Sequence, residues 1–503
     1  MGRKEQIINE RKRKLNELRE ITNPYPHRFD VKNYSEDIKE KYKKLKNDER
    51  TKDNVVIAGR IMTIRDLGKL IFATLQDSLG KIQIILQKSE TKNDNFEFFK
   101  KFIDVGDFVG CEGIVMKSIT GEISVLVKKF EILSKSLLPL PEKWHGLKDE
   151  EERYRKRYLD LIMNPEMKKV FETKSKIISI IRKYLHEEGF VEVETPLLQS
   201  VYGGASASPF KTHLNALDIE LFLSISPELY LKRLIVGGFD KIFTICKNFR
   251  NEGIDRQHNP EFTMLEYYTA YKDYTYHIEF TEKLFKLLKK ELNLPDFIDY
   301  YGKKINLKIP FKKITFREIL KKETGIDIDK ENEFGKLKKA IIDKKLSIDI
   351  KVCKHYGALL DELYKRIVRL NIIHPTFLTH YPAEMIALAK RNEKDKSKIN
   401  SVQLIIDGAE IVKAYDELND PEDQEKRLKE QADLLREGNE EAMPMDEDFI
   451  TALKYGMPPT AGYGLGIDRL IMILTGQESI KDVILFPFMR PVDKEDGKDD
   501  KIM

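Results

Sequence analysis

Apolar and polar residues follow three different patterns along the chain. Residues 5–20 have the pattern of a short, highly charged helix, which Pro24 and Pro26 end. From about Asn54 to Leu133 the pattern changes to short β-type runs separated by glycines. These runs are Val55–Ile64, Leu70–Leu75, Ile82–Leu86, Phe108–Met116 and Ile123–Leu133.

The order of these runs predicts a small β-barrel. A short helix is expected at Phe96–Phe102, between the third strand and the fourth. Five strands with a helix after the third is the order of an OB-fold, a barrel that commonly binds oligonucleotides. A different small barrel without a nucleic-acid role would show the same alternation, so the pattern alone leaves both interpretations open.

A second, larger domain is expected after a proline-rich segment. Residues 137–144 have the character of an ordered linker, since their prolines prevent a continuing strand or helix. Lys168–Glu188 then has apolar residues on one helical side and stops at Gly189, and Phe190–Pro196 alternates like a strand. We divide the chain into a charged helical extension, a barrel domain, a linker and a large second domain. Their residues are 1–53, 54–136, 137–160 and 161–503.

Composition argues against a membrane or secreted protein. Hydrophobic residues make up 41% of the 503 positions and charged residues 34%, and no apolar run reaches the roughly 18 residues of a membrane helix. The cysteines Cys111, Cys246 and Cys353 lack the spacing of a metal site or a disulfide framework. We therefore expect a cytoplasmic protein with no membrane partner. The net charge of +4 does not indicate a nucleic-acid binder, and a solvated helix face explains the basic run Arg11–Lys14.

The first candidate site follows the apolar run Lys241–Cys246. Arg250 is expected at the end of this strand, where its planar guanidinium suits a carboxylate or a phosphate. A surface salt bridge between Arg250 and Glu252 would explain the same residues. In the next expected strand, Glu266 and Tyr268 alternate and so share one face.

The second candidate site is a predicted hairpin. Asp407-Gly408 between two apolar runs is a strong hairpin signal. With this turn Ile405 faces Glu410, and Gln403 lies on the same face. Carboxylates that share a strand face with Ile and Val are unfavourable unless a metal or an ammonium group binds them. An edge strand with its charges in water would explain the segment equally well.

The third candidate site is glycine-rich. Gly464 and Gly466 precede Arg469 and the apolar run Leu470–Leu474. Such glycines let the backbone close tightly and would present the arginine at a helix N-terminus, where it suits a phosphate. The spacing differs from that of the dinucleotide-binding pattern, so the motif alone carries little information.

In chain order these segments resemble the signature motifs of class II aminoacyl-tRNA synthetases, over most of the chain. The segments similar to motifs 1, 2 and 3 are Gly189–Pro196, Asn248–Glu252 with Phe262, and Gly464–Arg469. Others resemble the lysine branch of the family, namely Gly203–Ala207, Pro227–Lys232, His258–Glu266 and Glu417–Asp420.

The resemblance implies an α+β fold. An N-terminal OB-fold β-barrel that binds the anticodon would precede a class II catalytic domain, whose mixed, mainly antiparallel sheet is flanked by helices. It also implies a lysine–tRNA ligase reaction with ATP, L-lysine and tRNA(Lys), in a homodimer built through motif 1. Adenylate formation needs positioned reactants and compensated charge rather than a protein nucleophile.

The same resemblance implies roles at the ATP site. Arg250 would hold the α-phosphate and the lysine carboxylate, Arg469 would hold the γ-phosphate, and Phe262 would stack on adenine. Mg²⁺ is the implied cofactor, with Glu410 and Gln403 as its ligands. The implied catalytic residues are Arg250, Glu252 and Arg469, and the further ATP-binding residues are Glu252, His258, Asn259, Glu410 and Gly466.

Acidic residues would select the amino acid. The family places Glu228 at the α-amino group, and Glu266, Tyr268 and Glu417 around the ε-ammonium. An aspartate enzyme, the nearest relative in fold, would need a cation there instead. The implied lysine-binding residues are Gly204, Glu228, Arg250, Glu266, Tyr268, Lys413, Tyr415 and Glu417.

In the barrel, three residues match positions that read the central anticodon uridine. Phe72 would stack on the base, while Arg65 and Gln83 would hydrogen-bond to its edge, as is usual for a splayed single-stranded base.

Two positions depart from the family pattern. Gln403 replaces a glutamate that usually shares Mg²⁺ with Glu410, so we expect weaker metal binding. Lys413 replaces an asparagine that contacts the substrate carboxylate. We expect its cation to take over that contact, although an outward-facing side chain of little consequence is the alternative.

Two competing functions deserve a test. A relative that lysylates a protein would lack the barrel that this chain has. A tRNA-binding paralogue with a weakened site is opposed by the intact set Arg250, Glu252, Glu266, Glu417 and Arg469.

Overall fold

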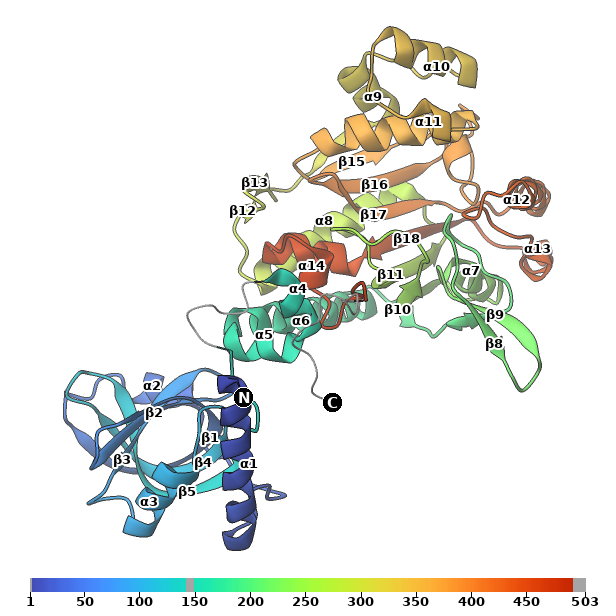
Figure 1. The fold of residues 1–503 in the computed structure, drawn as a ribbon. Coiled ribbons are helices and arrows are strands. Elements are labelled where there is room, and N and C mark those ends of the chain that lie inside the picture. Colours follow the sequence, from blue (N-terminus) through green and yellow to red (C-terminus); the bar gives the residue numbers. More distant parts are fainter. Residues whose placement is uncertain (1, 142–148, 492–503) are drawn as a thin grey trace. The chain divides into compact units, whose positions relative to one another are not determined.

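The computed structural model describes residues 2–141 and 149–491. The chain forms two compact units, Met1–Lys148 and Asp149–Met503 (Figure 1). The end of the proline-rich segment, residues 142–144, and the charged tail from Asp493 lie outside the described residues. No helix in the described ranges combines the length and the apolar character needed to cross a membrane.

The first unit contains a closed five-stranded barrel, with neighbouring strands in the order β1-β2-β3-β5-β4. The five expected strands and the small helix after the third are all present, so the predicted OB-fold order is confirmed. The elements are β1 (Arg50–Asp66), β2 (Leu70–Gln76), β3 (Lys81–Gln87), α3 (Asn93–Phe102), β4 (Phe108–Lys117) and β5 (Ile123–Ser134).

Two N-terminal helices, α1 (Arg3–Ile21) and α2 (Ser35–Tyr42), belong to the barrel unit. They contribute Leu18, Ile38 and Tyr42 to the apolar core of the barrel. The extension expected at the N-terminus is therefore packed against the barrel.

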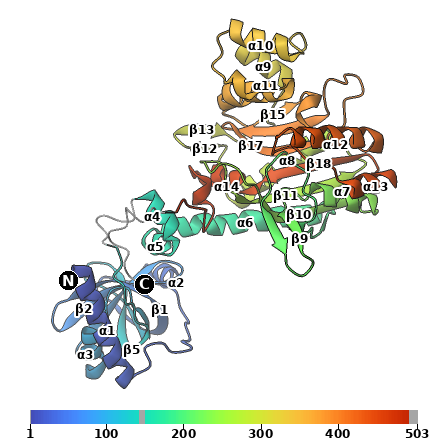
Figure 2. The same cartoon turned by 45° about the vertical axis from the view of Figure 1, so that its right-hand side comes forward.

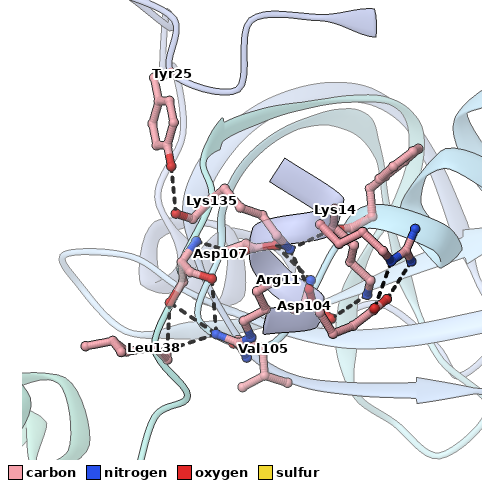
Figure 3. A network of polar contacts seen from close by, with 12 residues as sticks. Arg11, Lys14, Tyr25, Asp104, Val105, Asp107, Lys135 and Leu138 are labelled. Atoms are coloured by element: carbon pink, nitrogen blue, oxygen red, sulfur yellow. Dashed lines mark hydrogen bonds and ion pairs between the residues drawn. The ribbon is translucent and has the colours of Figure 1, made fainter. Parts of the chain in front are cut away.

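The basic run of α1 is partly buried, which corrects the expectation of a solvated face. Arg11 is 7% exposed and donates to the carbonyl oxygens of Val105 and Leu138 at 2.7 and 2.8 Å (Figure 3). Lys14 pairs with Asp104 at 2.8 Å. Since a buried guanidinium must be hydrogen-bonded, these contacts fix α1 to the end of the barrel.

The second unit is built on an eight-stranded sheet in the order β14-β15-β16-β17-β18-β11-β10-β6 (Figure 1). The β14–β15 and β10–β6 pairs are parallel and the other pairs are antiparallel, so the mixed, mainly antiparallel sheet is confirmed. Its strands are β6 (Val191–Glu192), β10 (Lys241–Phe249), β11 (Glu261–Ala270), β14 (Lys312–Thr315), β15 (Thr376–Thr379), β16 (Ser401–Ile406), β17 (Ala409–Asp416) and β18 (Thr460–Gly466).

Smaller elements surround this sheet. The strand expected over Phe190–Pro196 is only the two residues of β6, because just Val191 and Glu192 pair with β10. Two small sheets are formed by β7 (Leu198–Gln199), β8 (Lys211–Leu214) and β9 (Ile219–Leu223), and by β12 (Phe297–Tyr300) and β13 (Lys303–Asn306).

Helices cover both faces of the large sheet. Residues of α6, α8 and α14 pack in one apolar cluster with one face, and residues of α7, α9, α10, α11 and α13 pack in a second cluster with the other (Figures 1 and 2). The helices are α4 (Glu150–Arg155), α5 (Arg157–Met163), α6 (Pro165–Glu187), α7 (Glu228–Val236), α8 (Tyr274–Glu291), α9 (Phe316–Thr324), α10 (Phe334–Asp343), α11 (Tyr356–Leu363), α12 (Pro421–Arg436), α13 (Glu447–Lys454) and α14 (Ile467–Thr475).

Candidate active site

The predicted hairpin forms and positions two of the candidate residues. Asp407 and Gly408 connect β16 and β17 with φ angles of 45° and 70°, the left-handed values that a two-residue hairpin turn requires. Ile405 pairs with Glu410, as the turn predicts. The register then shifts by one residue, so Gln403 lies opposite Lys413.

Two rows of cross-strand neighbours form the floor of the site. Residues of one face alternate along each strand, so both rows look toward the same side of the sheet. The first row runs through Gln403, Lys413, Gly464, Glu266 and Thr244. The second row runs through Ser401, Tyr415, Gly462, Tyr268 and Ile242.

The central strand β18 contributes a glycine to each row. The missing side chains leave room above the strand for side chains of neighbouring residues. A Cβ atom at Gly462 would overlap Glu417 Oε1 and lie 2.6 Å from the Tyr268 ring, and one at Gly464 would lie 3.0 Å from Met264 Cε. The glycine motif therefore lies inside a strand rather than in a tight loop. Gly466 alone caps a helix, α14.

Three carboxylates converge above this floor. Glu228 opens α7, Glu266 lies on β11 and Glu417 follows β17, and each is at most 5% exposed. The ammonium of Lys232, which is fully buried, lies 2.6 Å from Glu228 Oε1 and 2.5 Å from Glu417 Oε2. The Ser226 hydroxyl donates to Glu266 Oε1 at 2.9 Å. The cluster thus holds more negative groups than positive ones.

Two further expected residues join this cluster. The Tyr415 hydroxyl donates to Glu228 Oε2 at 2.8 Å. Gly204 has a φ angle of 85°, and a Cβ there would lie 2.8 Å from Glu228 Cβ and 2.9 Å from Ser226 Oγ. The structure therefore brings together residues that the sequence placed in four separate segments, namely Gly204, Glu228, Glu266, Tyr268, Tyr415 and Glu417.

Burial leaves the cluster short of positive charge. Burial and the charge of Glu228 raise the pKa of Glu266 to about 8. Burial also raises the pKa of Glu417 well above its usual value, in spite of Lys232. Burial alone would lower the pKa of Lys232, but Glu228 and Glu417 outweigh it and raise that pKa. Glu417 Oε1 accepts no hydrogen bond from any residue that the structure describes. A buried acceptor without a partner is unfavourable, so it suits an ammonium ligand.

Arginines occupy the neighbouring part of the sheet. Arg250 follows β10, donates to Ile225 O at 3.4 Å, and lies over the Phe262 ring with its guanidinium carbon 5.1 Å from the centroid. Within the described ranges no ion pair joins Arg250 to Glu252, so the surface-salt-bridge interpretation is wrong. Arg250 is therefore available to bind an anion beside the half-buried ring of Phe262.

Arg469 lies in the first turn of α14. Its guanidinium donates to Glu410 O at 3.1 Å and to Gln257 O at 3.4 Å. Burial lowers the pKa of Arg469, and the charges of Arg250 and Arg369 act in the same direction. Arg469 thus lies among other arginines, an arrangement that suits a phosphate.

Sequence reasoning missed Arg369 and Lys232. The Nε atom of Arg369 is buried and has no hydrogen-bond partner within the part of the chain described. No local pattern distinguishes Arg369 from a surface arginine. For Lys232 a signal existed, because Glu228 lies four residues earlier and the two share one face of a helix.

The loop between β10 and β11 carries the other expected nucleotide residues. Glu252 is exposed on it. His258 Nδ1 lies 2.8 Å from Asp255 Oδ2, and the Asn259 amide donates to Glu261 O at 2.6 Å. These contacts hold the loop that connects Arg250 to Phe262.

The implied metal ligands lie on β16 and β17, but only one is a carboxylate. Gln403 Oε1 accepts a hydrogen bond from the buried Tyr381 hydroxyl at 2.7 Å. Lys413 lies opposite Gln403, and its side-chain ammonium makes no hydrogen bond or ion pair with a described residue. No group of three His, Cys, Asp or Glu in the described chain could hold a metal by itself. Mg²⁺ is commonly held by one or two carboxylates plus substrate phosphates, so Glu410 fits a metal that ATP brings with it.

The anticodon candidates share the outer face of the barrel. Their neighbours Ile71, Ala73 and Ile84 point into the core, so the residues that alternate with them point outward. Arg65 pairs directly with Phe72, and Gln83 lies opposite Thr74 on the adjacent strand pair. Gln83 Oε1 accepts a hydrogen bond from Ser124 at 2.9 Å.

The two units match two known families. Residues 149–490 match the family described as tRNA synthetases class II (D, K and N), and residues 55–133 match the OB-fold nucleic acid binding domain. The chain therefore belongs to the class II tRNA synthetases, and it is an aminoacyl-tRNA synthetase. The second match also decides between the two barrel interpretations in favour of the OB-fold.

Its relatives point to one branch of that family. The lysine--tRNA ligase of Pelotomaculum thermopropionicum is 46% identical over 97% of this chain and 96% of its own length. That of Fervidobacterium nodosum is 46% identical over 97% and 95%. The lysine--tRNA ligase 2 of Methanosarcina mazei is 47% identical over 94% and 91%.

Proposed function

We propose that this enzyme activates L-lysine with ATP and transfers it to tRNA(Lys). The observation that carries the proposal is the buried cluster of Glu228, Glu266 and Glu417 with a single internal cation, Lys232. The names of the relatives support the same reaction.

The pocket favours an amino acid with a cationic side chain. The ε-ammonium of lysine would bind between Glu266 and Glu417 Oε1, which lies over Gly462. Its α-amino group would bind at Glu228, beside Gly204. A neutral or acidic side chain would leave buried carboxylates unpaired, which is among the most unfavourable exchanges in a binding site.

Activation is a displacement at phosphorus. A carboxylate oxygen of lysine attacks the α-phosphorus, the bond to the β-phosphate breaks, and pyrophosphate leaves with the electron pair. Arg250 would hold the α-phosphate and the lysine carboxylate, Arg469 would hold the γ-phosphate, and Phe262 would stack on adenine. In the second step a ribose hydroxyl of the tRNA attacks the lysyl carbonyl carbon, and AMP leaves. Positioning and charge compensation supply the catalysis.

Glu410 would hold Mg²⁺ together with the phosphates. The bound ion would compensate negative charge on the triphosphate. Because Gln403 brings no charge and its oxygen already accepts from Tyr381, we propose that the protein contributes a single carboxylate to this metal. Lys413, whose ammonium has no described partner, would contact the substrate carboxylate. Lys413→Asn should raise both the KM for lysine and the Mg²⁺ requirement.

The outer face of the barrel would read the anticodon through Phe72, Arg65 and Gln83, and the enzyme would act as a homodimer. Support for the dimer comes from apolar side chains near motif 1 that are unusually exposed in one chain, Val191 at 48% and Leu198 at 52%. Sedimentation of the purified protein would test this association.

The deciding experiment is lysine-dependent ATP–pyrophosphate exchange during a Mg²⁺ titration, followed by charging of tRNA(Lys). Exchange and charging are expected, with a high Mg²⁺ requirement that reflects Gln403. Exchange without tRNA charging would favour a protein-lysylating enzyme. No exchange at any Mg²⁺ concentration would favour a tRNA-binding protein with a weakened site.

A further inference from the structure

Lys232 occupies an unusual place for a lysine. Its side chain is fully buried on α7, one turn after Glu228, and its ammonium bridges Glu228 Oε1 and Glu417 Oε2 at 2.6 and 2.5 Å. The rings of Tyr415 and Phe449 flank this ammonium, with centroids 6.0 and 5.9 Å away. The Lys232 ammonium is therefore not a surface cation.

The two oxygens of Glu417 face different surroundings. Oε2 pairs with Lys232, on the side of α7. Oε1 lies beside Gly462 and has no hydrogen-bond partner among the described residues. Lys232 therefore holds one side of the carboxylate, and the other side lies over Gly462 in the floor of the site.

The charge of the cluster explains why such a cation is needed. Three carboxylates come together within it, and Glu266 has only the Ser226 hydroxyl as a side-chain partner. Buried carboxylates without a cation become protonated, and a protonated carboxyl binds an ammonium group poorly. One internal ammonium opposes this protonation at the two carboxylates that it contacts, Glu228 and Glu417.

We propose that Lys232 is a positioning residue that determines specificity, because it holds the carboxylates of Glu228 and Glu417 oriented for the two amino groups of the substrate. The proposal rests on the proposed function and deepens it. Lys232 acts through the two glutamates and touches no reacting atom. It makes the empty pocket resemble the occupied one, so little reorganisation accompanies binding.

Other charged groups face the cluster and set the background of any pH measurement. They are Glu266 and Tyr268 on β11, Tyr415 and Asp416 on β17, Cys246 on β10 and Arg250 after β10. The carboxylates at the start of α13, Asp446 and Asp448, pair with Arg233 on α7.

The test is lysine-dependent exchange with Lys232→Ala between pH 6 and pH 9. We expect the KM for lysine at pH 7 to rise by at least about 30-fold, with a smaller effect on kcat, because removing one partner of a buried charge pair leaves the other uncompensated. The rise of kcat/KM with pH should move to higher pH. Added propylammonium, which fits the space left by the side chain, should restore the wild-type profile, whereas propanol should not. Lys232→Arg, which keeps the charge, should keep the wild-type pH midpoint.

The matched control is Lys135→Met in the barrel. Lys135 is also buried between two carboxylates, Asp104 and Asp107, but lies outside the site. This variant should lose stability without a change in the KM for lysine or in the pH profile. If Lys232→Ala does not fold, Lys232→Met, which keeps most of the volume, takes its place with the same expected shifts.

The outcomes separate the two proposals. A folded Lys232→Ala or Lys232→Met variant with the wild-type KM and pH profile overturns the inference, and so does a loss in Lys232→Ala that propylammonium does not reverse. A wild-type enzyme without lysine-dependent exchange overturns the proposed function instead, since that measurement involves no variant.

Discussion

Lys135 in the barrel and Lys232 in the catalytic unit have nearly the same description, a buried ammonium between two carboxylates. Lys135 Nζ contacts Phe102 O, Asp104 Oδ2 and Asp107 Oδ2 at 2.7, 2.5 and 2.7 Å (Figure 3). These acceptors use all three of its N–H groups. The remaining oxygens are also engaged, since Asp104 Oδ1 accepts from Lys14 and Asp107 Oδ1 accepts from the Ser136 amide.

The cluster around Lys232 is not closed in this way. Glu417 Oε1 has no hydrogen-bond partner in the described chain, and a third carboxylate, Glu266, has no cation of its own. Shifted pKa values do not distinguish the two clusters, because burial raises the pKa of Asp107 as well. The two clusters differ in one respect. The cluster around Lys232 leaves a carboxylate oxygen, Glu417 Oε1, without a described partner beside the glycine of β18.

The largest expected effect comes from removing the open acceptor. Glu417→Gln should lower kcat/KM for lysine by roughly 30- to 3000-fold, since truncating one partner of a buried charge pair costs about 2–5 kcal/mol. ATP–pyrophosphate exchange measures this. Asp107→Asn, its counterpart in the barrel, should destabilise that unit by about 3–5 kcal/mol, seen as faster amide exchange in β4 and β5. It should leave lysine activation intact, and equal effects of both variants on exchange would abolish the distinction.

A smaller effect is expected from filling the floor. In Gly462→Ala the new methyl group would overlap Glu417 Oε1 and press on Tyr268, so the KM for lysine should rise by roughly 5- to 150-fold, the equivalent of about 1–3 kcal/mol of overpacking. The barrel offers a matched case in Gly59→Ala, where the methyl group would meet Leu75 Cδ2 at 2.5 Å. That variant should lower the melting temperature alone. An unchanged KM in Gly462→Ala would mean that the floor is not the lysine pocket.

The barrel should affect enzyme activity only when tRNA is present. Phe72→Ala should raise the KM for tRNA(Lys) in charging by roughly 5- to 150-fold, because base stacking on an aromatic ring is worth about 1–3 kcal/mol. Exchange without tRNA should be unaffected. A normal KM for tRNA would remove Phe72 from the anticodon site.

A further expected effect is a change in the pH dependence of stability. The pKa of Glu266 is about 8 in the folded protein, above its usual 4.5. Its neutral form thus contributes stability that is complete below about pH 4.5 and lost as pH rises to about 8, with a slope of at most about 1.4 kcal/mol per pH unit. Glu266→Gln should flatten this loss in urea unfolding between pH 5 and pH 8. Parallel curves for the two proteins would show that Glu266 titrates normally.

The local pattern of apolar, polar and turn residues predicted much of the fold. The barrel strands, the Asp407-Gly408 turn and the shared face of Glu266 and Tyr268 follow from period and turn chemistry, which act between near neighbours. The strand expected over Phe190–Pro196 was mostly absent because its pairing depends on β10, fifty residues away. Burial of Arg11 was missed for a similar reason, since its acceptors lie about a hundred residues further along the chain.

Within the site, the sequence named the acidic residues through resemblance to a family, and the structure shows how they meet. The register shift that sets Lys413 opposite Gln403 was not predictable from the turn, because a bulge places an extra residue in one strand at a position that the turn does not fix. Arg369 gave no such clue to its surroundings, and for Lys232 the sequence offered only its spacing from Glu228.

The sequence by itself determined which residues this protein can use, namely a set of carboxylates, arginines and glycines at fixed separations, and the turns and periods that make strands of them. The tertiary structure decided which of those charges are left unpaired. Lys135 and Lys232 are the same residue type in the sequence. Packing gives every charged group around Lys135 a hydrogen-bond partner, whereas Lys232 lies beside a carboxylate that has one oxygen without a described partner. Pairing of buried charges depends on groups that are distant along the chain, so only the folded protein fixes it.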